Sequence, residues 1–360
     1  MSATSPRASV LGDPARLRSH AADAERFAAD RLAVAIEDVF LSQPGRLDDR
    51  ARAATLRLAE TTVGAIERQV AGNAARALAA TGRHEAAAAL QSNEAIAWPR
   101  LRDAGLMHDA ELIAELIAQA RIDLLDESLA MLRVHESGPT LATTLVERGT
   151  AAQRAAAMAY LIADGTRRLA LDGRQAALPM SLHARVVWWV AAALRERVGS
   201  AAGMEADVAL CEAAQHHIAL HDEAPVEDTA AALVHALDPT PDERVVLMVQ
   251  ALDSARLTLF AMLLAAALGI DAAAARALVL DSSSDRLWLA LRAVGMPRDS
   301  IAHAGFLLSE ADRERDLTML IETLDALAAL EPAAAAHALE ALRLPHDFRA
   351  AMRALARPTA

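Results

Sequence analysis

The chain has 360 residues, of which 54% are hydrophobic but only 3% are aromatic, and its formal net charge is −12. All 36 basic residues are arginine, and the acidic balance argues against a protein that binds a nucleic-acid backbone, because such a protein needs a basic face. Much of the hydrophobic fraction is alanine, the residue that loses least entropy on entering a helix. The composition therefore predicts an all-α protein, and the single cysteine, Cys211, excludes an internal disulfide framework.

The N-terminal stretch has no apolar core of the kind that a signal peptide contains. Residues 1–19 are therefore expected to form a flexible tail on a cytoplasmic protein. The most hydrophobic run is 257–270, which is shorter than the ~20 apolar residues needed to span a membrane. Because Arg256 and Asp271 bracket this run, we expect a buried core helix and no membrane insertion.

Glycine and proline residues recur along the rest of the chain and divide it into short predicted helices. Between them, apolar residues recur three and four positions apart, as in 112–117 and 317–327. We predict roughly sixteen to eighteen helices on this basis. The expected helix stops are Gly82, Gly105, Gly149, Gly173, Gly199, Gly269 and Gly295. Prolines that follow stops or open helices are Pro139, Pro179, Pro225, Pro239, Pro297, Pro332 and Pro345.

Many short helices joined by tight turns favour antiparallel neighbours, and a long series of them favours a HEAT-like α-solenoid. Residues 98–109 and 288–299 support repetition, because Trp, Leu, Arg, Gly and Asp recur at the same offsets in both. The alternative is chance similarity in a biased composition. Small, acidic and turn-forming residues at 199–228 indicate a boundary. We therefore expect an N-terminal helical-repeat lobe at 20–200 and a C-terminal helical lobe at 203–357.

The densest group of metal-ligand side chains lies between residues 211 and 223. On a helix, His217 and His221 share one face and form a weak candidate pair of metal ligands. Cys211 lies more than about 100° away around the same helix, and Asp222 and Glu223 could contribute only if the helix ends there. The alternative is a solvated, polar helix end, and it is the one we favour. The sequence thus predicts neither a metal nor a cofactor.

The sequence carries no clear catalytic pattern. It lacks a nucleophile elbow, an HExxH motif and a glycine-rich loop after a strand. His–Asp pairs at 108–109, 221–222 and 346–347 resemble those of metal-dependent phosphohydrolases, but each lies at an expected helix end, where aspartate is a common cap. The Ser282–Asp285 run is expected to cap the helix that carries Trp288. We predict no catalytic residue and no enzyme activity.

Tryptophan and arginine supply the candidate partner-binding residues. Trp188 and Trp189 diverge by about 100° on a helix, so either both are buried in different contact surfaces or one lies at a partner surface. Paired arginines could clamp a carboxylate or phosphate, or could be solvated and paired with Asp or Glu. The predicted partner-binding set is Trp98, Arg100, Arg102, Arg167, Arg168, Trp189, Trp288 and Arg292.

The stretch 92–120 resembles an uncharacterised bacterial family of HEAT-like helical-repeat proteins. The matching positions are Asn93, Glu94, Ala97, Pro99, Leu101, Arg102, Leu106 and Asp109. The stretches LPMSLHARVVWWVAAALRER and ARALVLDSSSDRLWLALRAVGMPRDSI are similar to the second half of that family, so the resemblance covers most of residues 20–330. Trp98 departs from the pattern, which has a small residue there. The resemblance implies a domain of unknown function that binds proteins by analogy with other repeats, and it supplies no catalytic residues.

Together these observations predict a non-catalytic protein-interaction or regulatory module with a protein partner of unknown identity. The first alternative is a sensor that holds a small, nucleotide-like anion between the lobes. The second is a metal-dependent hydrolase that uses His217 and His221. A homodimer formed through an Ala/Leu helix face is compatible with all three.

Overall fold

The computed structural model describes residues 48–92, 94–132, 141–169, 174–199, 203–221, 226–281, 283–312, 314–315 and 317–356. Within these ranges the chain forms 17 α-helices and no β-strand, which confirms the all-α prediction. The expected tail at 1–19 lies outside the described residues, as do Gly173, Asp222 and Glu223.

By its internal contacts the chain divides into two units that interleave along the sequence. The α2 unit contains the described residues within 48–120 and 166–225, and the α12 unit contains those within 121–165 and 226–356. The division falls inside the helices α5 (Ala110–Leu132) and α7 (Ala151–Leu169). Each unit thus combines two separate stretches of chain, whereas the lobes expected at 20–200 and 203–357 are consecutive.

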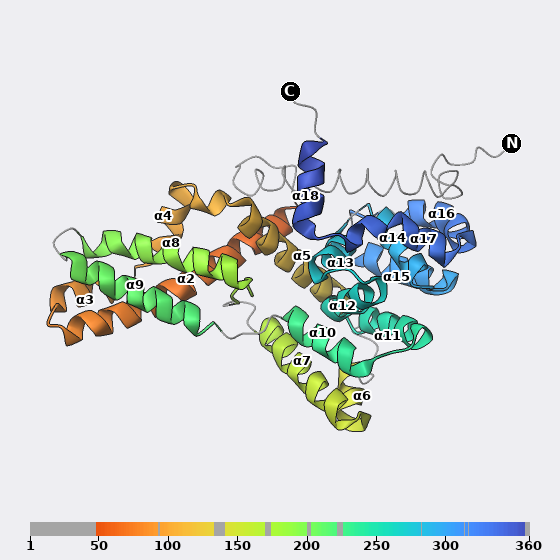
Figure 1. Cartoon of the computed structure of the whole chain (residues 1–360), viewed down its shortest axis with the longest axis horizontal. Coiled ribbons are helices and arrows are strands. Elements are labelled where there is room, and N and C mark those ends of the chain that lie inside the picture. The colour runs from red at the N-terminus through yellow and green to blue at the C-terminus, as the bar shows by residue number, and fades with distance from the viewer. Residues whose placement is uncertain are drawn as a thin grey trace. The chain divides into compact units, whose positions relative to one another are not determined.

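The α2 unit is built on the 32-residue helix α2 (Asp49–Ala80). Helices α8 (Met180–Val198) and α9 (Gly203–Ala219) pack against each other and against α2 (Figure 1). The shorter helices are α3 (His84–Leu90), α4 (Ala97–Asp103) and η1 (Leu106–His108), followed by the first part of α5.

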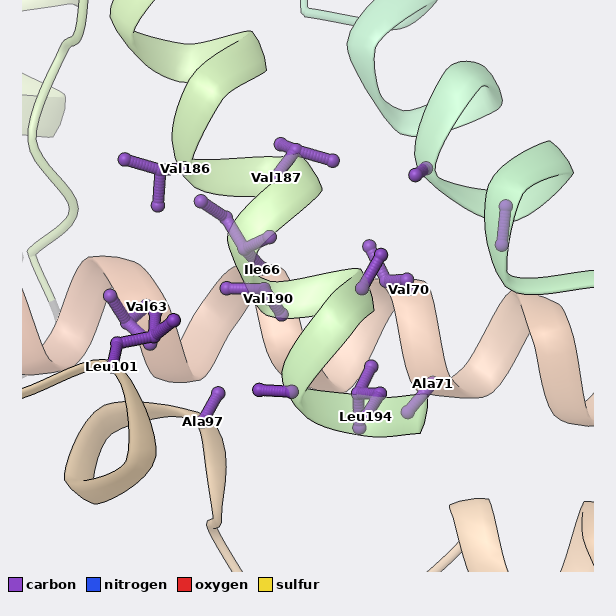
Figure 2. Packing of buried hydrophobic residues seen from close by; sticks show 14 of the residues in the cluster. Val63, Ile66, Val70, Ala71, Ala97, Leu101, Val186, Val187, Val190 and Leu194 are labelled. Carbon is purple, nitrogen blue, oxygen red and sulfur yellow. The ribbon is translucent and has the colours of Figure 1, made fainter. Parts of the chain in front are cut away.

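The core of the α2 unit follows from helical spacing. Val63, Ile66 and Val70 recur three and four positions apart on α2 and are buried. Figure 2 shows them beside α8, whose Val190 and Leu194 are also four apart and buried. Many other buried positions of α2 and α9 are alanine, which lets packed helices approach closely.

The α12 unit surrounds the helix α12 (Leu257–Leu268), which contacts α10, α11, α13 and α14. Ten of the helix's 12 residues are buried, so the prediction of a core helix in the run 257–270 is confirmed. The other helices of this unit are α6 (Leu141–Arg148), α10 (Val226–Leu237), α11 (Pro241–Asp253), α13 (Ala272–Leu280), α14 (Asp285–Ala293), α15 (Arg298–Ala311), α16 (Leu317–Ala329), α17 (Pro332–Ala338), η3 (Glu340–Arg343) and α18 (His346–Leu355).

Among the described helices none is by itself long and apolar enough to cross a membrane, although α12 and α13, bent by 119° at their junction, pass that test of length and composition as a pair.

Glycine ends several helices as predicted. Gly105 and Gly295 have φ of 75° and 82°, a left-handed conformation that residues with a Cβ seldom adopt. These two glycines occupy equivalent places in the 98–109 and 288–299 stretches, and each stands between two helical segments. The contacts after them differ, because Asp109 accepts a hydrogen bond from the Leu112 amide (2.9 Å) whereas Asp299 pairs with its neighbour Arg298.

Two helix starts are held by carboxylates that come from distant parts of the sequence. Glu67 of α2, which is buried, accepts from the Ile96 and Ala97 amides at the start of α4 (3.0 and 3.2 Å). Asp126 of α5, also buried, accepts from the Leu257 amide at the start of α12 (2.9 Å). Each carboxylate satisfies amides that a helix leaves unpaired at its first turn, so it fixes a short helix against a long one.

Candidate functional site

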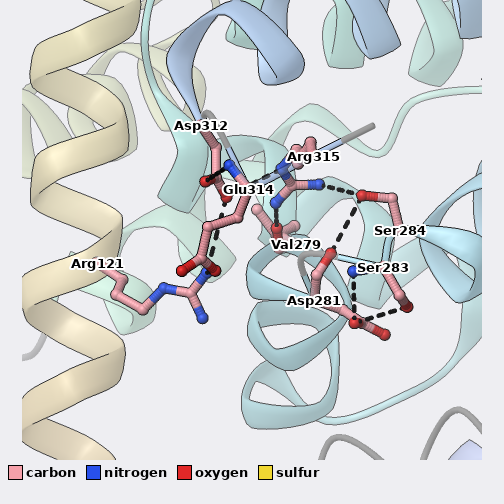
Figure 3. Close-up of polar contacts among 8 residues, drawn as sticks. All are labelled: Arg121, Val279, Asp281, Ser283, Ser284, Asp312, Glu314 and Arg315. Atoms are coloured by element: carbon pink, nitrogen blue, oxygen red, sulfur yellow. Dashed lines mark hydrogen bonds and ion pairs between the residues drawn. The ribbon is translucent and has the colours of Figure 1, made fainter. Parts of the chain in front are cut away.

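A cluster of charged side chains joins the chain after α15 to the start of α14 (Figure 3). Arg315 lies at its centre with only 1% of its side chain exposed. Its Nη1 donates to Ser284 Oγ (2.7 Å), its Nη2 donates to the Val279 carbonyl, and its Nε lies 3.3 Å from Asp312 Oδ2. Burial lowers the pKa of the Arg315 guanidinium, while Asp312 opposes that shift.

The other arginines of this cluster are also paired with carboxylates. Asp281 accepts from the Ser283 amide and hydroxyl (3.2 and 2.9 Å) and pairs with the buried Arg286 (3.0 Å). Arg121 of α5 approaches Asp312 (3.7 Å). Because all three arginines already face carboxylates, the cluster links segments of the α12 unit and is poorly suited to binding an added anion.

The serine run in this cluster was expected to cap α14. Ser284 does occupy the capping position, with a left-handed φ of 59°, but its side chain makes no capping hydrogen bond to that helix. Its hydroxyl instead donates to the Asp281 carbonyl (3.1 Å) and accepts from Arg315. Ser282 lies outside the described residues.

Three histidines gather at one end of the α8–α9 pair. His183 of α8 stacks on His221, with ring centroids 3.7 Å apart, and tilts against His217 of α9 at 5.2 Å. His221 Nε2 lies 3.2 Å from the Leu178 carbonyl oxygen. Burial lowers the pKa of His183 to about 4, and neighbouring histidines add to the shift. Burial likewise lowers the pKa of His217.

These rings are stacked and tilted against one another, whereas shared metal ligands converge on one point. In the part of the chain that the structure describes, no group of three or more His, Cys, Asp or Glu side chains is placed to hold a metal ion. His183, which the sequence analysis did not single out, packs against both His217 and His221. Cys211, the third residue weighed as a ligand, is exposed on α9.

The predicted tryptophans lie mostly inside. Trp98 and Trp189 pack, partly buried, against the core of the α2 unit, and Trp288 is 7% exposed. Trp188 is 39% exposed. In the adjacent pair, the solvent-facing residue is therefore Trp188, whereas the predicted set contains Trp189.

Three of the predicted arginines contact acceptors within the protein. Arg100 forms a two-point ion pair with Glu196 (2.6 and 2.9 Å), and Arg102 pairs with its neighbour Asp103. Arg292 Nε donates to the Leu330 carbonyl (2.6 Å). Arg167 and Arg168 are half-buried in the last turn of α7. The predicted set is divided between the two units, with Trp288 and Arg292 in the α12 unit and the other members in the α2 unit.

An exposed apolar face of α18 is the feature that sequence reasoning missed. Phe348, Met352 and Leu355 are 55%, 52% and 86% exposed, and Ala351 between them is also exposed. Positions 348, 351, 352 and 355 follow the i, i+3, i+4, i+7 spacing of one helix face. Arg349, about 100° around the helix from Phe348, is buried. The apolar stripe thus faces solvent, as do His346 and Asp347, while an arginine is buried beside it.

Two arginines fasten the α18 segment to the turn between α12 and α13. Arg343 Nε donates to the Leu268 carbonyl at the end of α12 (3.0 Å). Arg349 Nε donates to the Leu344 carbonyl (3.0 Å), and its Nη2 lies 3.5 Å from Asp271 Oδ2 at the start of α13. These contacts orient α18 so that its apolar face points away from the unit that holds it.

Comparison of the chain with protein-family models, with curated proteins and with solved structures gave no match.

Proposed function

We propose that this chain is a non-catalytic, cytoplasmic protein-interaction module of HEAT-like helical repeats, and that the apolar face of α18 is its binding surface. The partner chemistry that fits this face is an amphipathic helix with apolar side chains three and four positions apart. The packed α8–α9 pair and the left-handed glycines between helices support the repeat arrangement of this proposal.

The observation that carries the proposal is the grouping of exposed apolar side chains on one face. Single exposed apolar residues are normal on soluble proteins, and Phe306 and Ile321 are such cases. On α18, three large side chains and an alanine share one stripe, while an arginine occupies the inner side. Contiguous apolar surface of this kind marks interaction sites.

The two alternatives have weaker support. An anion sensor needs cationic groups available to the ligand, yet Arg100, Arg292 and Arg315 already bind protein acceptors. A hydrolase that used His217 and His221 would need them to converge on a metal, whereas both rings pack against His183.

A display library of helical peptides, selected on the purified chain, tests the proposal. The wild type and the control Ile321→Glu, a change at an exposed residue of α16, should enrich peptides that share one apolar spacing. The double variant Phe348→Glu/Met352→Glu should lose at least tenfold in affinity for those peptides, because charge replaces the centre of the stripe. Enrichment of no peptide family, or equal binding by the double variant, would contradict the proposal.

A further inference from the structure

Three histidines close one end of the packed helices α8 and α9 with little polar support. His183 of α8 lies in the middle, stacked on His221 and tilted against His217 of α9. Nε2 of His183 and Nε2 of His217 are buried, and among the described residues neither atom has a hydrogen-bond partner. A buried polar atom without a partner costs free energy that a hydrated form regains, so this end of the helix pair is a weak point of the α2 unit.

His221 connects this end to the chain that leads into α8. Its Nε2 lies 3.2 Å from the Leu178 carbonyl oxygen, and because a carbonyl can only accept, the imidazole N–H donates. The Ala176 amide nearby is held by an uncharged group, Thr62 Oγ1 of α2 (2.7 Å). The chain that follows α9 is thus tied to the chain before α8 through a side chain that can take up a proton.

The rings face one another and no carboxylate. The charges that act on His183 are those of His221 and His217, and the charges that act on His217 are those of His221 and His216. Helix α2, which packs against both α8 and α9, buries only uncharged side chains between residues 51 and 66. Within the described part of the chain, the ion pairs of histidine lie elsewhere, at His303, His337 and His346.

The other charged side chains of α8 are occupied or distant. Arg185, two residues after His183, lies 2.8 Å from Asp109 and 3.2 Å from Glu111. The next charged residues of α8 lie more than about three turns beyond His183, and they are Arg195, Glu196 and Arg197. A proton on His183 would therefore place a positive charge among buried rings that offer it no negative partner.

From this geometry we infer that His183, His217 and His221 form a pH-sensitive latch: while neutral they hold residues 214–221 against the start of α8, and their protonation releases this stretch while the core of the α2 unit stays folded. The core contacts of α8, through Val190 and Leu194, lie two turns or more beyond the latch. The inference goes beyond the proposed function and does not depend on it, because it concerns the α2 unit alone.

The direction of the pH effect follows from burial. Burial lowers the pKa of His183 to about 4, against 6.5 for an ordinary histidine, so an open form that hydrates this ring binds the proton first. The closed latch is therefore most favoured above pH 6.5, and its advantage declines as the pH falls towards 4. At pH 5 the open form should be favoured on the order of thirtyfold more than at pH 7.

Hydrogen–deuterium exchange of the full chain at pH 7 and at pH 5, read by mass spectrometry, tests the inference. In the wild type, the protection of amides within 214–221, corrected for the direct effect of pH on exchange, should fall on the order of thirtyfold. Amides around Val70 in the α2 core should remain about tenfold or more better protected than 214–221 at both pH values.

A matched pair of variants assigns the effect to the latch. His183→Phe keeps a ring of similar size but cannot take up the proton, so it should remove most of the fall in protection. The control His84→Phe changes an exposed histidine of α3 in the same unit and should leave the fall unchanged. Slow exchange around Val70 verifies that each variant is folded.

The imidazole resonances of the wild type give a second measurement that needs no variant, because the buried His183 ring should still be neutral at pH 5 in the folded chain. Four results would overturn the inference. They are equal protection of 214–221 at the two pH values, an undiminished fall in His183→Phe, a protonated His183 ring in the folded chain at pH 5, and protection around Val70 that drops to the level of 214–221, which would show that the whole unit unfolds.

Discussion

Arg349 Nη2 lies 3.5 Å from Asp271 Oδ2, across 78 residues of sequence, and Arg349 is buried where it makes this contact. Asp271 also caps α13 through the Ala274 amide (2.5 Å), so its carboxylate serves the helix start and the arginine together. Because adjacent residues on a helix diverge by about 100°, burying Arg349 turns Phe348 outward. The exposed apolar face of α18 thus accompanies the burial of Arg349 against Asp271.

Arg349→Met should loosen α18 without unfolding the chain. The variant removes a charged donor from a buried position, a loss of about 1 to 3 kcal/mol that falls on the local opening of α18. Amide exchange within 346–355 should rise accordingly, while exchange in α12 stays constant. Arg298→Met, which breaks an exposed pair with Asp325, should change neither. Unchanged exchange in α18 would show that Arg349 does not anchor it.

Arg197→Met should destabilise the chain far more than Arg100→Met. Arg197 and Glu67 form a buried ion pair at 2.9 Å, with 9% and 5% of their side chains exposed, and Glu67 also holds the start of α4. Removing one partner leaves a buried charge under-compensated, at a cost of about 3 kcal/mol. Arg100 and Glu196 form an exposed pair that solvent screens, so its loss should change the stability little. Urea unfolding measures both, and equal losses would contradict this account.

Gly305→Ala and Gly72→Ala should have opposite effects. A Cβ on Gly305 in α15 would collide with Leu320 Cδ2 of α16, so the substitution overpacks the contact and should cost about 1 to 3 kcal/mol. No atom lies within 4 Å of a Cβ added to the exposed Gly72 in α2, where alanine should stabilise by about 0.5 to 1 kcal/mol. Thermal unfolding checks the signs. In a Leu320→Ala background, which removes the clashing methyl group, Gly305→Ala should no longer destabilise the chain, and an unchanged loss there would argue against the contact.

Stability should fall as the pH drops from about 6.5 towards 4. Burial holds the pKa of His183 at about 4 in the folded chain, against 6.5 for an ordinary histidine, so the unfolded chain binds more protons in this window. The contribution is fully present above pH 6.5 and is lost on acidification. His183→Phe should reduce the acid-induced loss by on the order of 2 kcal/mol. An unchanged pH profile in His183→Phe would contradict this account.

Local features of the fold could be predicted from sequence because their signals are local. Apolar residues between Leu257 and Leu268 identified a core helix, and glycines such as Gly105 and Gly295 identified helix stops. Thr240 and Glu243 form a capping box that the sequence spacing also permits, since both partners lie within one turn.

Long-range pairings could not be predicted in this way. Glu67 and Arg197 lie 130 residues apart, and no periodicity identifies them as partners. His183 stacks on His221 because α8 and α9 are packed side by side, which spacing within one helix does not reveal. For α18, Phe348, Met352 and Leu355 share one helix face, but the rule that apolar faces turn inward fails there, because these side chains are exposed while Arg349 is buried.

The most direct test of the central claim is photo-crosslinking from the apolar face of α18 in the intact chain. In the presence of a selected helical peptide, a photoreactive phenylalanine analogue at position 352 should crosslink efficiently to that peptide, whereas the same analogue at the exposed position 321 should not. Crosslinking from position 352 that is no stronger than from position 321 would contradict the claim that this face is a binding surface.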